Sequence, residues 1–169
     1  MKRIPLLAVA AMALVLTIAS LAPAHPHIKK DITVKLPAGA AVTISYITEP
    51  SNESHTANAA VGSFLHAGAR IALSAEVKTG TVTLPAGEYT IGAIKNGDND
   101  YTMALYPARL RLSDPVDTAK AIKLESVFSR DMGTAHHMLV DVSPGHGKLE
   151  GKTVLTLHFG KLYLAGGLL

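Results

Sequence analysis

DITVKLPAGAAVTISYIT, residues 31–48, decides the fold class. Apolar and polar residues alternate on both sides of the central LPAG, so that Ile32 and Val34 share one face of the first segment and Val42 and Ile44 share one face of the second. A period of two residues is typical of a half-buried β-strand. In LPAG, the proline fixes φ at the second turn position and the glycine supplies a positive φ two residues later. The stretch therefore predicts two antiparallel strands joined by a tight turn.

Similar patterns recur along the rest of the chain. Further strands are predicted in RIALSAEV (70–77), TVTL (81–84), EYTIGAI (88–94), YTMALY (101–106), AIKLESVF (121–128), HHMLVDV (136–142) and KTVLTLHFGKLYL (152–164). Hairpin turns are predicted at a second LPAG (84–87), at Asn96-Gly97 and at SPGHGKLEG (143–151). Short strands separated by turn signals predict an all-β fold: a single-domain antiparallel β-sandwich of about eight or nine strands.

Two segments lack the strand pattern. Residues 49–63 show no periodicity, which predicts a long loop between sheets or edges. SDPVDTAKA (113–121) places Pro115 after an aspartate and predicts at most one or two turns of helix.

The first 24 residues have the pattern of a secretory signal peptide. Lys2 and Arg3 precede an apolar run, which ends in the small-x-small sequence Ala22-Pro23-Ala24. A membrane span also needs about 20 apolar residues, but the A-x-A ending favours cleavage after Ala24. We therefore expect a signal peptide at 1–24 and an exported domain at 25–169, periplasmic or secreted. No later stretch is apolar enough to span a membrane.

The composition of the chain limits the classes of partner and of chemistry that we expect. The chain has 16 Lys+Arg and 13 Asp+Glu, and loss of Lys2 and Arg3 would leave 14 against 13. This near-balance gives no reason to expect nucleic acid or an anionic membrane as partner. The chain has no cysteine, which excludes thiol catalysis, thiolate metal sites and lipoprotein acylation, and it has no tryptophan.

A family resemblance is carried by GTVTLPAGEYTIGAIKNGDNDYTMALY (80–106) and, more loosely, by residues 31–50, 64–77 and 136–164. These stretches resemble a bacterial family of exported single-domain β proteins that is catalogued as domain-of-unknown-function family 2911. Where members carry a Trp-Arg-x-Gly-Ala-Asn-type segment, this chain reads FLHAGARI and matches only at Gly68-Ala69. Tyr101 stands where a tryptophan is common. The resemblance implies an exported β fold and no reaction.

The mature terminus would begin with histidine. Cleavage after Ala24 gives His25 a free α-amine beside its imidazole, and with another imidazole this is the ligand set of a copper histidine brace. Pro26 has no N–H, so the usual terminal tripeptide copper site is disfavoured. A brace or a two-imidazole site with His27 remains. The alternative is a hydrated terminus with incidental histidines.

A second candidate metal site depends on strand register. If Val142 pairs with Thr153, His137 lies directly opposite His158, with Cβ atoms about 5 Å apart and Asp141 on the same face. Zinc or copper accepts such a set. A shift of two residues would destroy this pairing. The alternative is a solvated pair of surface histidines, or one histidine covered by a loop.

The other histidines carry weaker expectations. We expect His136 to face inward beside Phe159, and His55 and His146 to lie solvated in loops. His66 is ambiguous.

The sequence contains no nucleophile elbow and no clear paired-carboxylate pattern. It therefore favours a non-enzymatic exported module that binds a small ligand, an envelope component or a protein. The alternative is a periplasmic copper-binding protein that uses His25, His27, His137 and His158.

Overall fold

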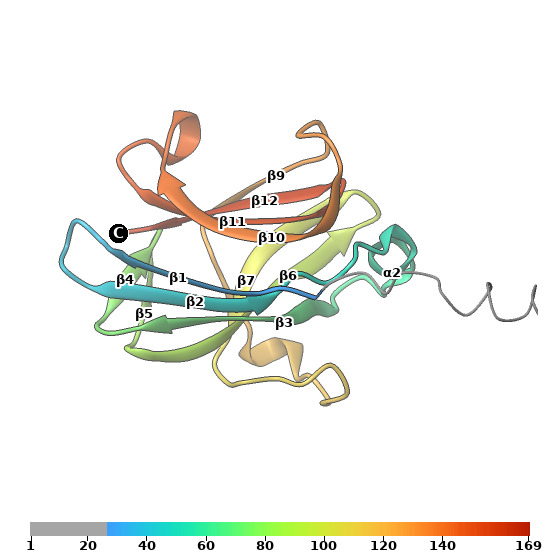
Figure 1. The fold of residues 1–169 in the computed structure, drawn as a ribbon, viewed down its shortest axis with the longest axis horizontal. Coiled ribbons are helices and arrows are strands. Elements are labelled where there is room, and N and C mark those ends of the chain that lie inside the picture. The colour runs from blue at the N-terminus through green and yellow to red at the C-terminus, as the bar shows by residue number, and fades with distance from the viewer. Residues whose placement is uncertain (1–26) are drawn as a thin grey trace, which may run out of the picture.

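The computed structural model describes residues 27–169 and contains two β-sheets that face each other (Figure 1). The larger sheet has the strand order β1-β2-β3-β6-β7-β8, and the smaller has the order β10-β11-β12-β9. A two-stranded sheet, β4-β5, lies at one end. All neighbouring strands are antiparallel. The prediction of an all-β antiparallel sandwich is confirmed.

The described strands are β1 (Lys29–Lys35), β2 (Ala41–Ile47), β3 (Phe64–Leu73), β4 (Val77–Thr79), β5 (Val82–Leu84), β6 (Gly87–Gly97), β7 (Asp100–Tyr106), β8 (Ile122–Lys123), β9 (Ser126–Ser129), β10 (Ala135–Pro144), β11 (Thr153–Gly160) and β12 (Leu162–Leu168). These twelve strands exceed the eight or nine expected because three predicted strands are divided, the first of them at 70–77, where β3 ends at Leu73 and β4 begins at Val77. The segment 152–164 turns back at Lys161, so that β11 pairs with β12. The segment 121–128 crosses between the sheets, with β8 in the larger and β9 in the smaller.

The core lies between the two sheets, and the alternating pattern that opened the sequence supplies part of it. Val42 and Ile44 are fully buried, and Tyr46 is nearly so. Residues from the facing sheet, among them Met138 and Leu155, belong to the same apolar cluster. Burial of this apolar surface is the main force that holds the sheets together.

The two LPAG segments have different roles. In the first, the Gly39 amide donates to the Leu36 carbonyl at 2.9 Å, and Gly39 has a φ of +99°. This is the predicted hairpin turn. The second LPAG closes no hairpin, because β5 pairs with β4 whereas β6 pairs with β3 and β7. It is a link between sheets, in which the Tyr89 hydroxyl donates to the Pro85 carbonyl at 2.7 Å.

The hairpin predicted at Asn96-Gly97 is present, but its turn is shifted. Gly97 pairs with Asp100, so Asp98 and Asn99 form the turn. The register shifts between Lys95 and Gly97.

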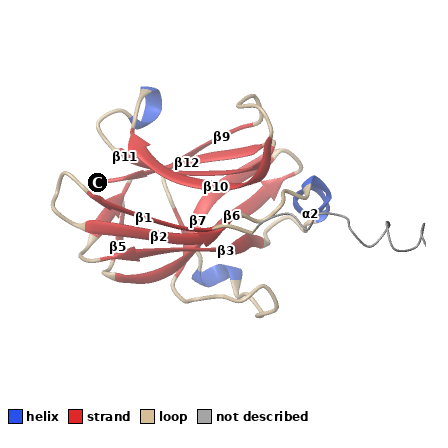
Figure 2. Ribbon diagram, viewed as in Figure 1, coloured by secondary structure: helices blue, strands red, loops and turns tan. Residues whose placement is uncertain are grey.

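Helical structure is short and peripheral (Figure 2). The segment predicted as a loop at 49–63 contains α2 (Glu53–Asn58), whose N-terminus is capped by Asn52. The predicted turn of helix at 113–121 is reduced to a 3-10 turn, η1 (Thr118–Lys120). A second 3-10 turn, η2 (Gly147–Leu149), lies in the β10–β11 connection. Within residues 27–169, no helix is long and apolar enough to cross a membrane.

Residues 107–121 form an excursion over the outer face of the larger sheet, on the side away from β9–β12 (Figure 1). Thr90 on β6 is fully buried beneath it. Its hydroxyl donates to the Ala108 carbonyl at 2.7 Å and accepts from the Leu110 amide at 2.9 Å. Leu110 lies in a small apolar cluster with Phe64 and Tyr106. The excursion is therefore fixed to the sheet by the Thr90 hydroxyl and by apolar side chains, with Val116 and Ala121 packed against the same cluster as Leu110.

Candidate functional site

The predicted pairing of His137 with His158 is wrong. Val142 lies opposite Leu155, and His158 lies opposite Leu139. The register shifts between Ala135 and Leu139, because the start of β10 also pairs with the segment before α2. There His137 forms a bridge with Pro50, and the Met138 amide donates to the Glu49 carbonyl at 2.7 Å. This pairing was not visible in the local pattern.

The side chains around this hairpin have other environments. The His158 ring stands edge-on to Tyr163, with ring centroids 5.5 Å apart. The Asp141 carboxylate accepts from the amide of Val142 at 2.8 Å. His136 is exposed, so its predicted inward position is also wrong. In the part of the chain that the structure describes, no group of three or more His, Asp and Glu side chains could hold a metal ion.

His25 and the predicted signal peptide lie outside the described residues. His27 is described, and its Nδ1 lies 3.5 Å from the Glu49 carboxylate. The next residue, Ile28, is fixed by two hydrogen bonds of 3.0 Å to Thr48. Since Pro50 bridges His137, the start of β1 and the start of β10 both meet the segment 48–50.

The most distinctive charged feature lies on the outer face of the larger sheet. Arg70, Arg109 and Arg111 line one cleft of about 410 Å³, together with Gly68 and Leu110. Within residues 27–169, none of these three guanidinium groups forms an ion pair with a carboxylate. We call this feature the arginine cleft. Three unpaired guanidinium groups in one cleft form a site suited to an oxyanion.

The fold explains why the arginines converge. Arg70 lies on β3 opposite Thr90, just beyond a register shift that contains Gly68, which has a φ of +74°. Thr90 also fixes the excursion, and Leu110 points down into the apolar cluster. The flanking residues Arg109 and Arg111 are consequently exposed above the sheet.

Two nearby carboxylates, those of Asp114 and Asp31, have other partners. Asp114 accepts from the Arg111 backbone amide at 2.8 Å. A hydrogen bond from Lys29 is the main cause that lowers the pKa of Asp31, and Arg70 contributes least. The Lys29 ammonium lies 2.9 Å from Asp31. Neither carboxylate forms an ion pair with a guanidinium group of the cleft.

His66, whose position the sequence left ambiguous, is half-buried on β3 beside Phe64. Its ring stacks on Phe64, with centroids 5.9 Å apart. Burial lowers the pKa of His66, and the carboxylate of Asp114 opposes that shift. Its Nδ1 is buried and has no hydrogen-bond partner. His66 therefore favours the neutral form in the folded protein.

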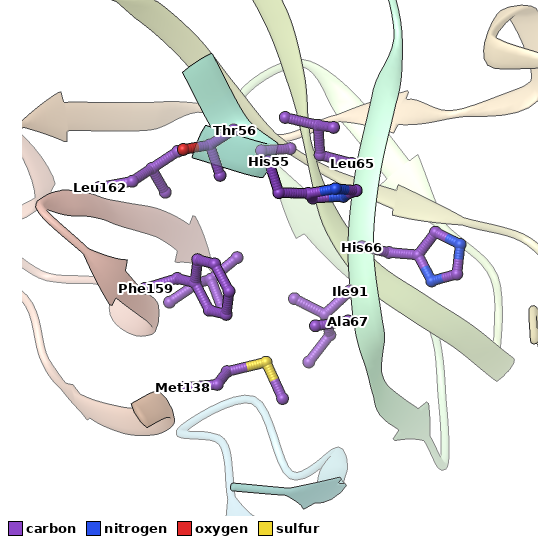
Figure 3. A pocket seen from close by; sticks show the side chains of 11 residues that line it. His55, Thr56, Leu65, His66, Ala67, Ile91, Met138, Phe159 and Leu162 are labelled. Carbon is purple, nitrogen blue, oxygen red and sulfur yellow. The ribbon is translucent and has the colours of Figure 1, made fainter. Parts of the chain in front are cut away.

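A second pocket, of about 50 Å³, lies between the sheets near α2 (Figure 3). Its walls are mostly apolar and include Ala67, Met138 and Phe159. His55 and His66 are also among the residues that line it. The volume accommodates a few water-sized molecules, far less than the roughly 300 Å³ or more typical of ligand pockets.

The helix α2 beside this pocket contributes no buried residue of its own. The Lys95 ammonium is almost fully buried and donates to the carbonyls of Ala57 at 2.6 Å and Ala59 at 3.0 Å. The Tyr101 hydroxyl donates to the Thr56 carbonyl at 3.1 Å. Side chains from β6 and β7 therefore hold α2 in place.

Sequence reasoning missed the arginine cleft. The available signal was PARLRL (107–112), in which two arginines flank a leucine. Nothing in the local sequence showed that Arg70, almost forty residues earlier, would join them.

Comparisons with known proteins give no indication of what this site binds. No family model, no curated protein and no solved structure matches this chain. The resemblance to domain-of-unknown-function family 2911 thus stays an expectation. The fold and the site define a class: an antiparallel β-sandwich with a cationic cleft on the outer face of its larger sheet.

Proposed function

We propose that this protein is an exported, non-enzymatic binding module whose ligand carries an oxyanion, held in the arginine cleft. The observation that carries the proposal is the convergence of three guanidinium groups without a carboxylate partner among the described residues. Arginine presents its donors in a planar fork that matches phosphate and carboxylate oxygens. Leu110 and Thr90 hold two of these arginines above the sheet before any ligand binds.

The test is calorimetric titration of the mature protein with inorganic phosphate at low ionic strength, since salt screens exposed charges. We expect measurable binding that weakens by about tenfold for each of Arg109→Gln and Arg111→Gln. Arg130→Gln is the matched control, because Arg130 is an exposed arginine outside the cleft. Absence of phosphate binding in the unaltered protein, or equal weakening by the control, would reject the proposal.

Export rests on the pattern in residues 1–24. Expression of the full chain in a bacterium should give a processed protein outside the cytoplasm that begins at His25. Terminal sequencing and intact mass check this cleavage, and an unprocessed chain in the cytoplasm would contradict it.

A second candidate function is copper binding at the mature terminus. It is favoured by the position of His27, whose imidazole lies beside the Glu49 carboxylate. With His25 two residues earlier, the terminus offers an amine, two imidazoles and a carboxylate, a donor set that suits Cu(II).

The copper test is a Cu(II) titration of mature protein by calorimetry and electron paramagnetic resonance. We expect tight binding with a nitrogen-rich spectrum, lost when one residue is added before His25. Binding that survives this addition would move the site to histidines within the domain. Weak binding in both proteins would remove copper as a candidate.

A further inference from the structure

Arg70 lines two adjoining hollows on the outer face of the larger sheet. One is the arginine cleft, and the other is a groove of about 230 Å³ over β2, β3 and β6. The polar residues of this groove are Thr43, Ser45 and Glu88. A ligand whose oxyanion meets Arg70 therefore has a second polar surface directly beside it.

Glu88 gives this groove the opposite charge to the cleft. Glu88 lies opposite Ala72 on β3, whereas Thr90 lies opposite Arg70. Arg70 and Glu88 are therefore diagonal neighbours on two paired strands, at positions about 7–8 Å apart. Glu88 is exposed and forms no ion pair with any residue in 27–169.

The chain thus holds an unpaired cationic cleft and an unpaired carboxylate side by side. A simple anion would satisfy the arginines and would be repelled by Glu88. A ligand with an ammonium group a short distance from its oxyanion would satisfy both. The hydroxyls of Thr43 and Ser45 add acceptors for the ammonium protons.

We infer that the cleft and the groove together bind an aminoalkyl phosphate, with the phosphate at Arg70, Arg109 and Arg111 and the ammonium at Glu88. This inference rests on the proposed oxyanion function and specifies its ligand. The same chemistry occurs in a free phosphoamine and in an amine-bearing phospholipid headgroup.

The test compares O-phosphoethanolamine, inorganic phosphate and ethanolamine by calorimetry with the mature protein. We expect O-phosphoethanolamine to bind about three- to fivefold more tightly than phosphate, the effect of one partly screened ion pair. Glu88→Gln should abolish this preference while keeping phosphate binding. The matched control is Glu76→Gln, an exposed glutamate outside the groove, which should keep the preference.

The outcomes separate the two proposals. Equal affinity for both phosphates in the unaltered protein, or a preference that survives Glu88→Gln, overturns the inference and leaves the oxyanion site standing. Binding of neither phosphate overturns both. Vesicles that contain phosphatidylethanolamine distinguish the source: Glu88-dependent binding assigns the headgroup, and binding of the soluble compound alone assigns a free phosphoamine.

Discussion

Gly92 on β6 shows how a single residue fixes a close approach between strands. It lies opposite His66, and a Cβ added there would meet the Leu65 carbonyl oxygen and would lie 2.5 Å from a ring carbon of Phe64. The missing side chain leaves room for the Phe64 ring, which packs in the same cluster as Leu110 of the excursion that carries two of the arginines.

We therefore expect Gly92→Ala to lower the free energy of unfolding by about 1–3 kcal/mol, because backbone and ring must move to admit the methyl group. Urea denaturation measures the change. Gly97→Ala is the control, since the nearest atom to an added Cβ there is 4.0 Å away. Equal stability of the two variants would show that the sheet relaxes at Gly92 at little cost.

His66 gives the protein a pH-dependent stability. Burial lowers its pKa in the folded state below the usual 6.5, so the unfolded chain binds more protons just below pH 6.5. The stabilising contribution of neutral His66 is fully present above pH 6.5 and is lost as the pH falls from there through the folded pKa.

Unfolding free energies at several pH values between 7.5 and 5 should therefore fall less steeply in His66→Gln than in the unaltered protein. His146→Gln, which replaces an exposed histidine in the β10–β11 connection, is the control for the loss of a histidine side chain. A slope that is the same in all three proteins would show that His66 is not buried in solution.

At the scale of elements, Thr90 connects the larger sheet to the excursion at 107–121 through two hydrogen bonds. Thr90→Val keeps the shape of the side chain and removes both bonds, which leaves a buried amide and a carbonyl unsatisfied. We expect a loss of about 1–3 kcal/mol in the free energy of unfolding.

The same substitution should weaken phosphate binding, because Arg109 and Arg111 lose their fixed position. Thr102→Val on the neighbouring strand β7 serves as the control, as its hydroxyl accepts only from the Asn96 side chain. Unchanged phosphate affinity in Thr90→Val would mean that the apolar contacts of Leu110, Val116 and Ala121 position the excursion without the two hydrogen bonds.

The elements also show what the sequence could predict. Local period and turn chemistry were enough for β1, β2 and the Gly39 turn between them. They failed where the outcome depended on distant segments. Pairing with Pro50 shifts the register at His137. The second LPAG is a link between sheets because the strands on either side of it pair with other strands.

The candidate site, too, depends on contacts between segments that are far apart in the sequence. Histidines drew attention because their chemistry is visible in one residue, yet the structure separates His137 from His158 along the hairpin. The arginine cleft is built from β3 and the excursion, so it exists only after β3, β6 and the loop above them have assembled.

At the scale of the whole molecule, the last residues join separate sheets. Leu169 and Lys78 exchange two backbone hydrogen bonds, at 3.0 and 2.8 Å, which connect the end of β12 to β4. The side chain of Leu168 is fully buried in the main core.

Deletion of Leu168 and Leu169 should lower Tm by more than about 10 °C, because it removes a buried leucine and both bonds. Differential scanning calorimetry measures the change. Leu169→Ala alone, which keeps the backbone bonds, should have a much smaller effect. A deletion variant with unchanged Tm would show that the β4–β12 junction contributes little.

The way in which α2 is attached determines where the molecule opens by local unfolding. A helix without buried residues, held by the Lys95 and Tyr101 side chains, can detach while both sheets keep their hydrogen bonds. Its amide protons should then exchange with deuterated solvent long before those of β6 and β7. Each such opening would widen the small apolar pocket beneath α2, so that its size in the closed state is a lower bound on what it can admit.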